Sequence, residues 1–94
     1  METFIMFGKY SVESLKGMNP ERTKEVLELI TKYGGEVKSM YALLGQRDLV
    51  FIVDFPSTDV AIKTSVAVNK TTGISFTTSP AVTVDEFDNL TSDI

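Results

Sequence analysis

Residues 37–55 decide the fold of this chain and read VKSMYALLGQRDLVFIVDF. Two runs rich in β-branched and aromatic residues, 37–44 and 49–55, flank a short polar segment that begins with Gly45. Two such runs around a short glycine-containing turn predict an antiparallel hairpin. The hairpin lies in the middle of the chain, so the elements on each side of it determine the topology.

A helical pattern precedes the hairpin. Asn19 is a good cap, Pro20 suits the first helical position, and Gly34-Gly35 is typical of a helix end. Between them, apolar residues recur at helical spacing, namely Val26, Leu29, Ile30 and Tyr33, whereas the other side is lined by charged residues that include Arg22. A second helix is predicted after the hairpin, with Ser57 as its cap and its end at residues 71–73.

Strand candidates occupy both ends of the chain, at residues 3–10 and 74–84. Pro80 cannot donate to a ladder, so the last strand is expected at a sheet edge. The order strand, helix, strand, strand, helix, strand predicts one α+β domain over residues 1–94, with a four-stranded sheet covered by two helices on one face. Residues 85–90 are expected to form a short terminal helix, with Phe87 and Leu90 packing back onto the domain.

Absent residue types restrict the chemistry. The chain has no Cys and no His, which excludes disulfides, a thiolate nucleophile and the commonest metal ligand and general base. We therefore expect no metal and no cofactor. A net charge of −4 disfavours a nucleic-acid partner. No apolar run approaches the ~18 residues that span a membrane, and the N-terminus lacks a signal-peptide pattern. We expect a cytoplasmic protein without a membrane partner.

The strand pattern predicts a second apolar face on the sheet. In residues 49–55, one parity holds Leu49, Phe51, Val53 and Phe55, and the other holds Val50 and Ile52. Because two helices cover only one face, the other face needs another cover. The simplest cover is a second copy docked sheet to sheet with two-fold symmetry. The alternative is that the C-terminal segment folds over part of this face.

Several segments together resemble one family. They are the first strand ending in Gly8-Lys9-Tyr10, the segment EVKSMYALLG at 36–45, Asp48-Leu49-Val50, and TGISFTTSPA at 72–81. Over nearly the whole chain they resemble the GYD domain family, which implies a ferredoxin-like βαββαβ fold that associates as a dimeric α/β barrel. Arg47 occupies the position where the family pattern leads us to expect Tyr.

The hairpin is also similar to the effector-binding domain of leucine-responsive regulators, where a Gly-x-Tyr-Asp turn lies near a ligand site at a subunit interface. The turn residues Gly45, Arg47 and Asp48 are therefore candidates for binding a small anion or an amino-acid-like ligand. The simpler interpretation is a plain hairpin turn, in which glycine supplies a positive φ and Asp48 bonds the backbone.

Lys9, Tyr10 and Tyr41 lie at or near strand ends and are expected to converge on a pocket inside a dimeric barrel. There a tyrosine can donate a hydrogen bond, and a desolvated lysine can act as a base. The simpler interpretation is that the tyrosine rings pack and that the lysine extends its ammonium group to water.

Asp54 stands among apolar residues, where a carboxyl group can have a raised pKa and serve as an acid or base. Alternatively, it marks the strand's exit and helps the next helix begin. Thr77 belongs to a hydroxyl-rich strand with Ser75, Thr78 and Ser79, which either lines a polar cavity or simply suits an edge strand.

These observations favour a homo-oligomeric module that binds a small ligand at or near the sheet-to-sheet interface. The alternative is a cofactor-independent small enzyme, resembling the monooxygenase or isomerase members of the dimeric barrel group. Such an enzyme would use Tyr, Lys and carboxylate groups in the barrel cavity. The missing histidine argues against the haem-dependent members of that group. Whether the protein is an enzyme stays open at this point.

Overall fold

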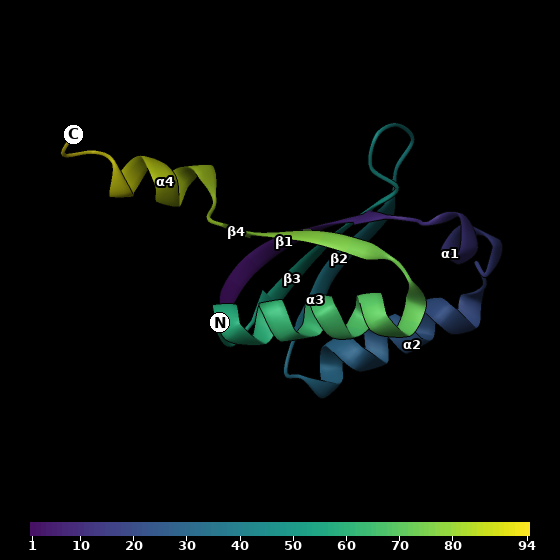
Figure 1. Cartoon of the computed structure of the whole chain (residues 1–94). Helices are drawn as coiled ribbons and strands as arrows, with labels where there is room; N and C mark the ends of the chain where they lie inside the picture. The colour runs from purple at the N-terminus through teal and green to yellow at the C-terminus, as the bar shows by residue number, and fades with distance from the viewer.

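The computed structural model describes all residues from Met1 to Ile94. Eight elements follow one another along the chain: β1 (Glu2–Lys9), α1 (Val12–Lys16), α2 (Pro20–Lys32), β2 (Glu36–Ala42), β3 (Leu49–Phe55), α3 (Thr58–Thr72), β4 (Ser75–Ala81) and α4 (Val84–Leu90). The strands form one antiparallel sheet in the order β2-β3-β1-β4 (Figure 1). The predicted α+β fold with a four-stranded antiparallel sheet is confirmed.

The two long helices begin where the caps predict. Asn19 accepts a hydrogen bond of 2.9 Å from the backbone N–H of Arg22, and Ser57 accepts one of 3.3 Å from that of Val60. Helix α3 ends at Gly73, whose φ of +78° lies in the left-handed region that glycine adopts without a steric cost. No helix in the chain combines the length and the apolar character needed to cross a membrane.

The predicted hairpin is present, but β2 is shorter than expected. It ends at Ala42, so Leu43 and Leu44 belong to the β2–β3 loop, residues 43–48. The loop closes through a 2.8 Å hydrogen bond from the Leu43 N–H to the Asp48 carbonyl, and the Leu44 side chain is fully exposed beyond it. The apolar run 42–44 therefore does not continue the strand, because the chain already turns there.

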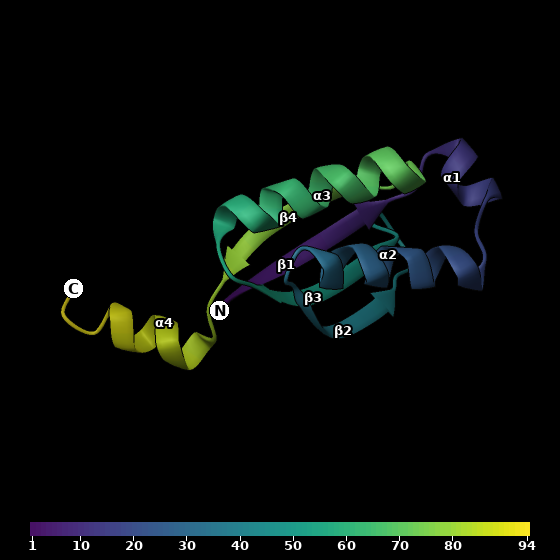
Figure 2. The same ribbon diagram turned by 90° about the horizontal axis from the view of Figure 1, so that it is seen from below.

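Helices α2 and α3 cover one face of the sheet and enclose the core (Figure 2). The buried core consists of Phe4, Met6, Val26, Ile30, Phe51, Val53, Phe55, Ala61 and Val68. At its centre the rings of Phe4 and Phe55 meet edge to face with centroids 5.7 Å apart. Each large apolar side chain buried here contributes roughly 1.5–3 kcal/mol, so this face supplies most of the domain's stability.

The opposite face of the sheet, which we call the free face, has a mixed character. Along its middle, β1 and β3 present four half-buried apolar side chains, the central stripe: Ile5, Phe7, Val50 and Ile52. Along one margin, β4 presents the exposed polar residues Ser75, Thr77 and Ser79. The expectation of a second apolar face thus holds for the two central strands and fails at β4. The strand that contains Pro80 lies at the sheet edge, as predicted.

Helix α4 does not pack back onto the domain, and that expectation is wrong. Phe87 is 55% exposed and Leu90 is 65% exposed, and the helix extends beyond the end of β4 (Figures 1 and 2). The Cα radius of gyration is 14.3 Å, against about 12 Å for a compact chain of this length. The Thr83 side chain accepts a 3.1 Å hydrogen bond from the Glu86 N–H and so caps the helix. Only two residues then separate β4 from α4, and so short a link leaves little room for a reversal of the chain.

We predict that Gly35→Ala lowers the free energy of unfolding by about 1–3 kcal/mol. A β-carbon at Gly35 would lie 2.6 Å from the Phe55 ring and 2.7 Å from Ile30, both in the packed core. Urea unfolding followed by circular dichroism measures the loss. Gly17→Ala is the control, because its nearest neighbour would lie 3.5 Å away. Equal midpoints for the two variants would contradict this account of the α2–β2 connection.

Candidate functional site

One apolar cavity lies on the helix side of the sheet, between α2, the segment before it, and strands β2 and β3. Its volume is about 160 Å³, and its lining includes Tyr10, Met18, Val26, Met40, Tyr41 and Phe51. We call it the α2–β2 cavity. Since its wall is mostly apolar with a few polar tips, it has the character of a small-molecule site.

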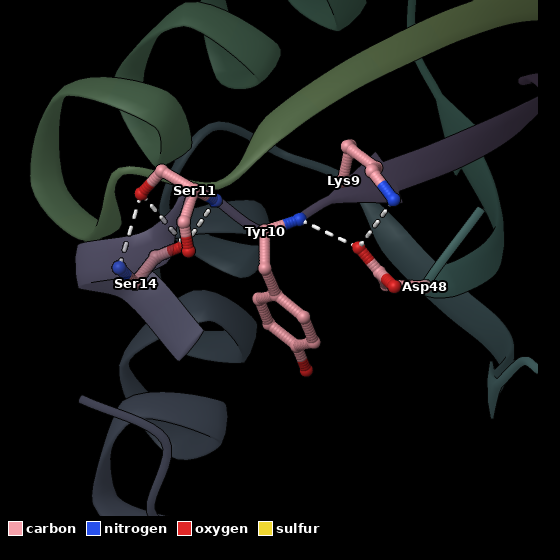
Figure 3. A network of polar contacts seen from close by, with 5 residues as sticks. All are labelled: Lys9, Tyr10, Ser11, Ser14 and Asp48. Atoms are coloured by element: carbon pink, nitrogen blue, oxygen red, sulfur yellow. Dashed lines mark hydrogen bonds and ion pairs between the residues drawn. The ribbon is translucent and has the colours of Figure 1, made fainter. Parts of the chain in front are cut away.

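Tyr10 is held at the cavity by anchors on both sides of it. Its backbone N–H donates a 2.8 Å hydrogen bond to the Asp48 carboxylate (Figure 3). The next residue, Ser11, caps α1 in a reciprocal box with Ser14, with bonds of 3.0 and 2.7 Å between side chains and backbone N–H groups. The backbone of Tyr10 is therefore fixed, and Figure 3 shows its ring extending away from both anchors.

Arg22 places a positive charge at the wall of the cavity. Its guanidinium carbon lies 5.4 Å from the centroid of the Tyr10 ring, and its Nη1 donates a hydrogen bond to the Ser14 carbonyl. A cation over an aromatic face is attracted by the ring quadrupole. The arrangement joins α1, α2 and the end of β1 into one wall beside the cavity.

The structure brings two of the three predicted pocket residues together. Tyr10 and Tyr41 both line the α2–β2 cavity, and Tyr41, which pairs with Val50 of the free face, is 60% exposed. Lys9 lies elsewhere, because its ammonium group is 3.6 Å from the Asp48 carboxylate at the end of β1 (Figure 3). A site built from both tyrosines and the lysine is thus not assembled within one copy of the chain.

The predicted turn residues lie on the other side of the sheet, at one end of the free face. Gly45 has a φ of +134° and would have no neighbour within 4 Å even with a side chain, as in an exposed turn. The Arg47 guanidinium lies 5.2 Å from the centroid of the Phe7 ring, over the end of the central stripe. Asp48 connects this loop to β1 through its bonds to Tyr10 and Lys9.

Asp54 lies at the opposite end of the free face and is fully partnered. Its carboxylate accepts a 2.7 Å bond from the Thr3 hydroxyl and lies 3.5 Å from the Lys38 ammonium group. Lys38 reaches it because a bulge in β2 places this residue between two that pair with successive residues of β3. The hydrogen bond with Glu36, then the charges of Glu36 and Asp54, raise the pKa of Lys38 above its ordinary value.

Thr77, the last predicted site residue, lies on the exposed margin of the free face, opposite Phe7 in the β1–β4 pairing. The predicted residues therefore fall into two groups. Tyr10 and Tyr41 belong to the α2–β2 cavity, and the others lie around the free face: Lys9, Gly45, Arg47, Asp48, Asp54 and Thr77.

Sequence reasoning missed several cavity residues. The helical pattern predicts Val26 only as part of the helix core and Arg22 only on the exposed side, and it predicts no role for Met18. The cap at Asn19 gives a sequence signal for Met18. The residue before an N-cap often packs against the fourth residue of the helix, a contact called a hydrophobic staple. That rule places Met18 beside Thr23, and both line the cavity.

Comparison with known proteins places the fold. Residues 4–91 match the GYD domain family. Among solved structures, the leucine response regulatory protein LrpA of Mycobacterium tuberculosis is similar with a TM-score of 0.58 at 12% identity, covering 87% of this chain and 51% of that one. A further transcriptional regulator gives the same TM-score, 0.58, at 12% identity, covering 88% of this chain and 51% of that one. A search of curated proteins finds no match.

At this level of identity the likeness to the regulators concerns the fold alone, and the chain spans about half of their length. The ferredoxin-like architecture that the resemblance implied is confirmed by this likeness and by the strand order β2-β3-β1-β4. The family match extends from the first strand to the residue after α4. This chain therefore belongs to the GYD domain family.

Proposed function

We propose that this domain is a homo-oligomeric module that binds a small aromatic or apolar ligand in the α2–β2 cavity. The observation that carries this proposal is the cavity itself, an apolar hollow of about 160 Å³ beside two tyrosines and an arginine. An apolar cavity of ~150 Å³ is large enough to admit benzene. The size therefore favours a ligand with a single small ring.

The lining supports an aromatic ligand in particular. Met18 and Met40 contribute thioether groups, which adapt their shape and contact ring edges favourably. Tyr10 adds aromatic surface and one hydroxyl, which can fix the orientation of a polar substituent. The Arg22 guanidinium at the wall favours a substituent that is electron-rich or negatively charged.

The cavity also lies near the surface that we propose for self-association. Tyr41 lines the cavity and pairs across the sheet with Val50 of the central stripe, so it connects the cavity to the free face. The central stripe, with its polar margin, has the composition of a protein interface, an apolar core inside a polar rim. A second copy docked on this face by two-fold symmetry would cover Ile5, Phe7 and Ile52.

We expect the wild-type chain to sediment at no less than twice its mass of 10.4 kDa, and Ile52→Lys to sediment as the monomer. A lysine in the central stripe would bury an unpaired charge in the interface, which is strongly unfavourable. Ile62→Lys is the matched control, because Ile62 is 58% exposed on α3, a helix of the covered side. A monomeric wild-type chain at micromolar concentration would refute the self-association.

For the cavity, we expect phenol, benzoate or indole to raise the melting temperature in a thermal-shift series. A ligand at 100 times its Kd adds about 2.7 kcal/mol to the free energy of unfolding. Val26→Phe should abolish the shift by filling the cavity, while Leu27→Phe, on the next residue of α2, should retain it. Binding that persists unchanged in a folded Val26→Phe protein would place the ligand elsewhere.

A further inference from the structure

The free face lies between two projections at opposite ends of the sheet. Helix α4 follows β4 beyond the end where β1 begins, and the β2–β3 loop stands at the end where β1 finishes. Figure 1 shows both on the side of the sheet that faces away from α2 and α3. The free face is therefore a floor bounded by a projection at each end.

Helix α4 is an amphipathic element with no partner in its own chain. Its apolar residues Val84, Phe87 and Leu90 recur every third residue and are 74%, 55% and 65% exposed. Its remaining side chains include the acids Asp85, Glu86 and Asp88, and its last turn carries no basic residue. The projection thus offers a short apolar stripe beside negative charge.

The β2–β3 loop offers the complementary surface. Leu44 is fully exposed and Leu43 is 38% exposed, so two leucine side chains lie at the loop. Beside them are the exposed Arg47 and the Lys9 side chain, which is 58% exposed. At this end Lys9 is paired with Asp48, so Arg47 supplies the positive charge beside the two leucines, whereas the α4 end is apolar and acidic.

The floor of the free face is of moderate size. Four strands about 4.8 Å apart, each about seven residues long at ~3.4 Å per residue, give a footprint of roughly 450 Å². A standard interface buries about 800 Å² per partner. Contacts from both projections would add to the area that a second copy covers.

Symmetry allows two ways to bring the projections together. If the two-fold axis runs across the strands, α4 of each copy lies at the loop end of the other's free face. A tilt of the axis toward the diagonal of the sheet aligns α4, which follows the edge strand β4, with the loop between β2 and β3. If the axis runs along the strands, the two α4 helices meet each other, which would bring six acidic side chains together in two copies of Asp85, Glu86 and Asp88. Juxtaposed like charges disfavour an interface and complementary ones favour it, so charge selects the first arrangement.

We propose that α4 of one copy packs against the β2–β3 loop of a second copy, so that each protomer holds its partner at both ends of the free face. Phe87 and Leu90 would then be covered by Leu43 and Leu44 of the other copy, with Arg47 beside the acids of α4. This arrangement rests on the proposed self-association through the free face and adds to it the direction of the axis and the role of α4.

Cysteine cross-linking tests the arrangement, because the natural chain has no Cys. Asn89→Cys and Gln46→Cys proteins, mixed and mildly oxidised, should form a disulfide between the two chains. The two positions within one copy are separated by the eight residues of β1, about 26 Å at ~3.3 Å per residue. Each chain carries a single cysteine, so any disulfide joins two chains, and its formation requires the two Cα atoms to come within about 7 Å.

Two controls give the cross-linking a definite outcome. Asn89→Cys mixed with Lys63→Cys should give no heterodimer, because Lys63 lies on α3 of the covered side. Asn89→Cys alone should remain uncrosslinked. A disulfide in Asn89→Cys alone, in preference to the mixture with Gln46→Cys, would overturn the proposal in favour of the axis along the strands.

Removing the apolar contacts of α4 provides an independent measurement. Phe87→Ser/Leu90→Ser should raise the dimer Kd at least about 100-fold by sedimentation equilibrium, because four large apolar side chains, two from each copy, lose their cover. Folding is not at risk, because no residue of α4 is buried in its own chain. Ser92→Ala is the control and should leave the Kd unchanged.

The two proposals fail in different ways. A wild-type dimer that Ile52→Lys dissociates, but whose Kd Phe87→Ser/Leu90→Ser leaves unchanged, would overturn the role of α4 and keep the free-face interface. A wild-type chain that is monomeric would overturn both.

Discussion

The structure depends on one constraint: a sheet whose two central strands are apolar on both faces has only one layer of helices. Helices α2 and α3 bury Phe4, Met6, Phe51 and Val53 on one side. The alternate residues of the same strands, such as Ile5 and Ile52, are left half-buried on the other side. Because alternation along a strand is strict, the chain cannot move these side chains into its own core. The half-buried central stripe on the free face is the result of having two apolar sheet faces and a single layer of helices.

The cavity and the free face are separate surfaces, but the same residues fix both. Asp48 holds the backbone of Tyr10, a cavity residue, through a 2.8 Å bond, and also lies 3.6 Å from Lys9 at the end of the free face. The β2–β3 loop therefore cannot shift without disturbing the connection from β1 to α1. A partner that orders this loop would also order one wall of the cavity, which gives a physical route for coupling between ligand and assembly.

Most of the fold can be predicted from local sequence patterns. The caps at Asn19 and Ser57, the glycine at Gly73 and the proline at Pro80 each require a specific backbone geometry, and each lies where the sequence predicts. The candidate site was harder to predict, because its wall combines side chains from three segments that meet only after folding. Met18, Val26 and Met40 line one cavity, yet each has an ordinary place in its own local pattern.

The wrong prediction for α4 has a related cause. The sequence correctly indicates a helix with Phe87 and Leu90 on one apolar side, and such a side needs cover. Val84, which the sequence assigns to the last strand, begins this helix because β4 ends at Ala81. Periodicity does not say which molecule supplies that cover. For a terminal element it gives the same pattern whether the helix packs on its own domain or on another copy. The same ambiguity applies to the central stripe, since Val50 and Ile52 fit a strand covered from within or from outside. The chain thus carries two elements whose apolar sides its own fold leaves uncovered, α4 and the central stripe, and the local pattern of neither one identifies its cover.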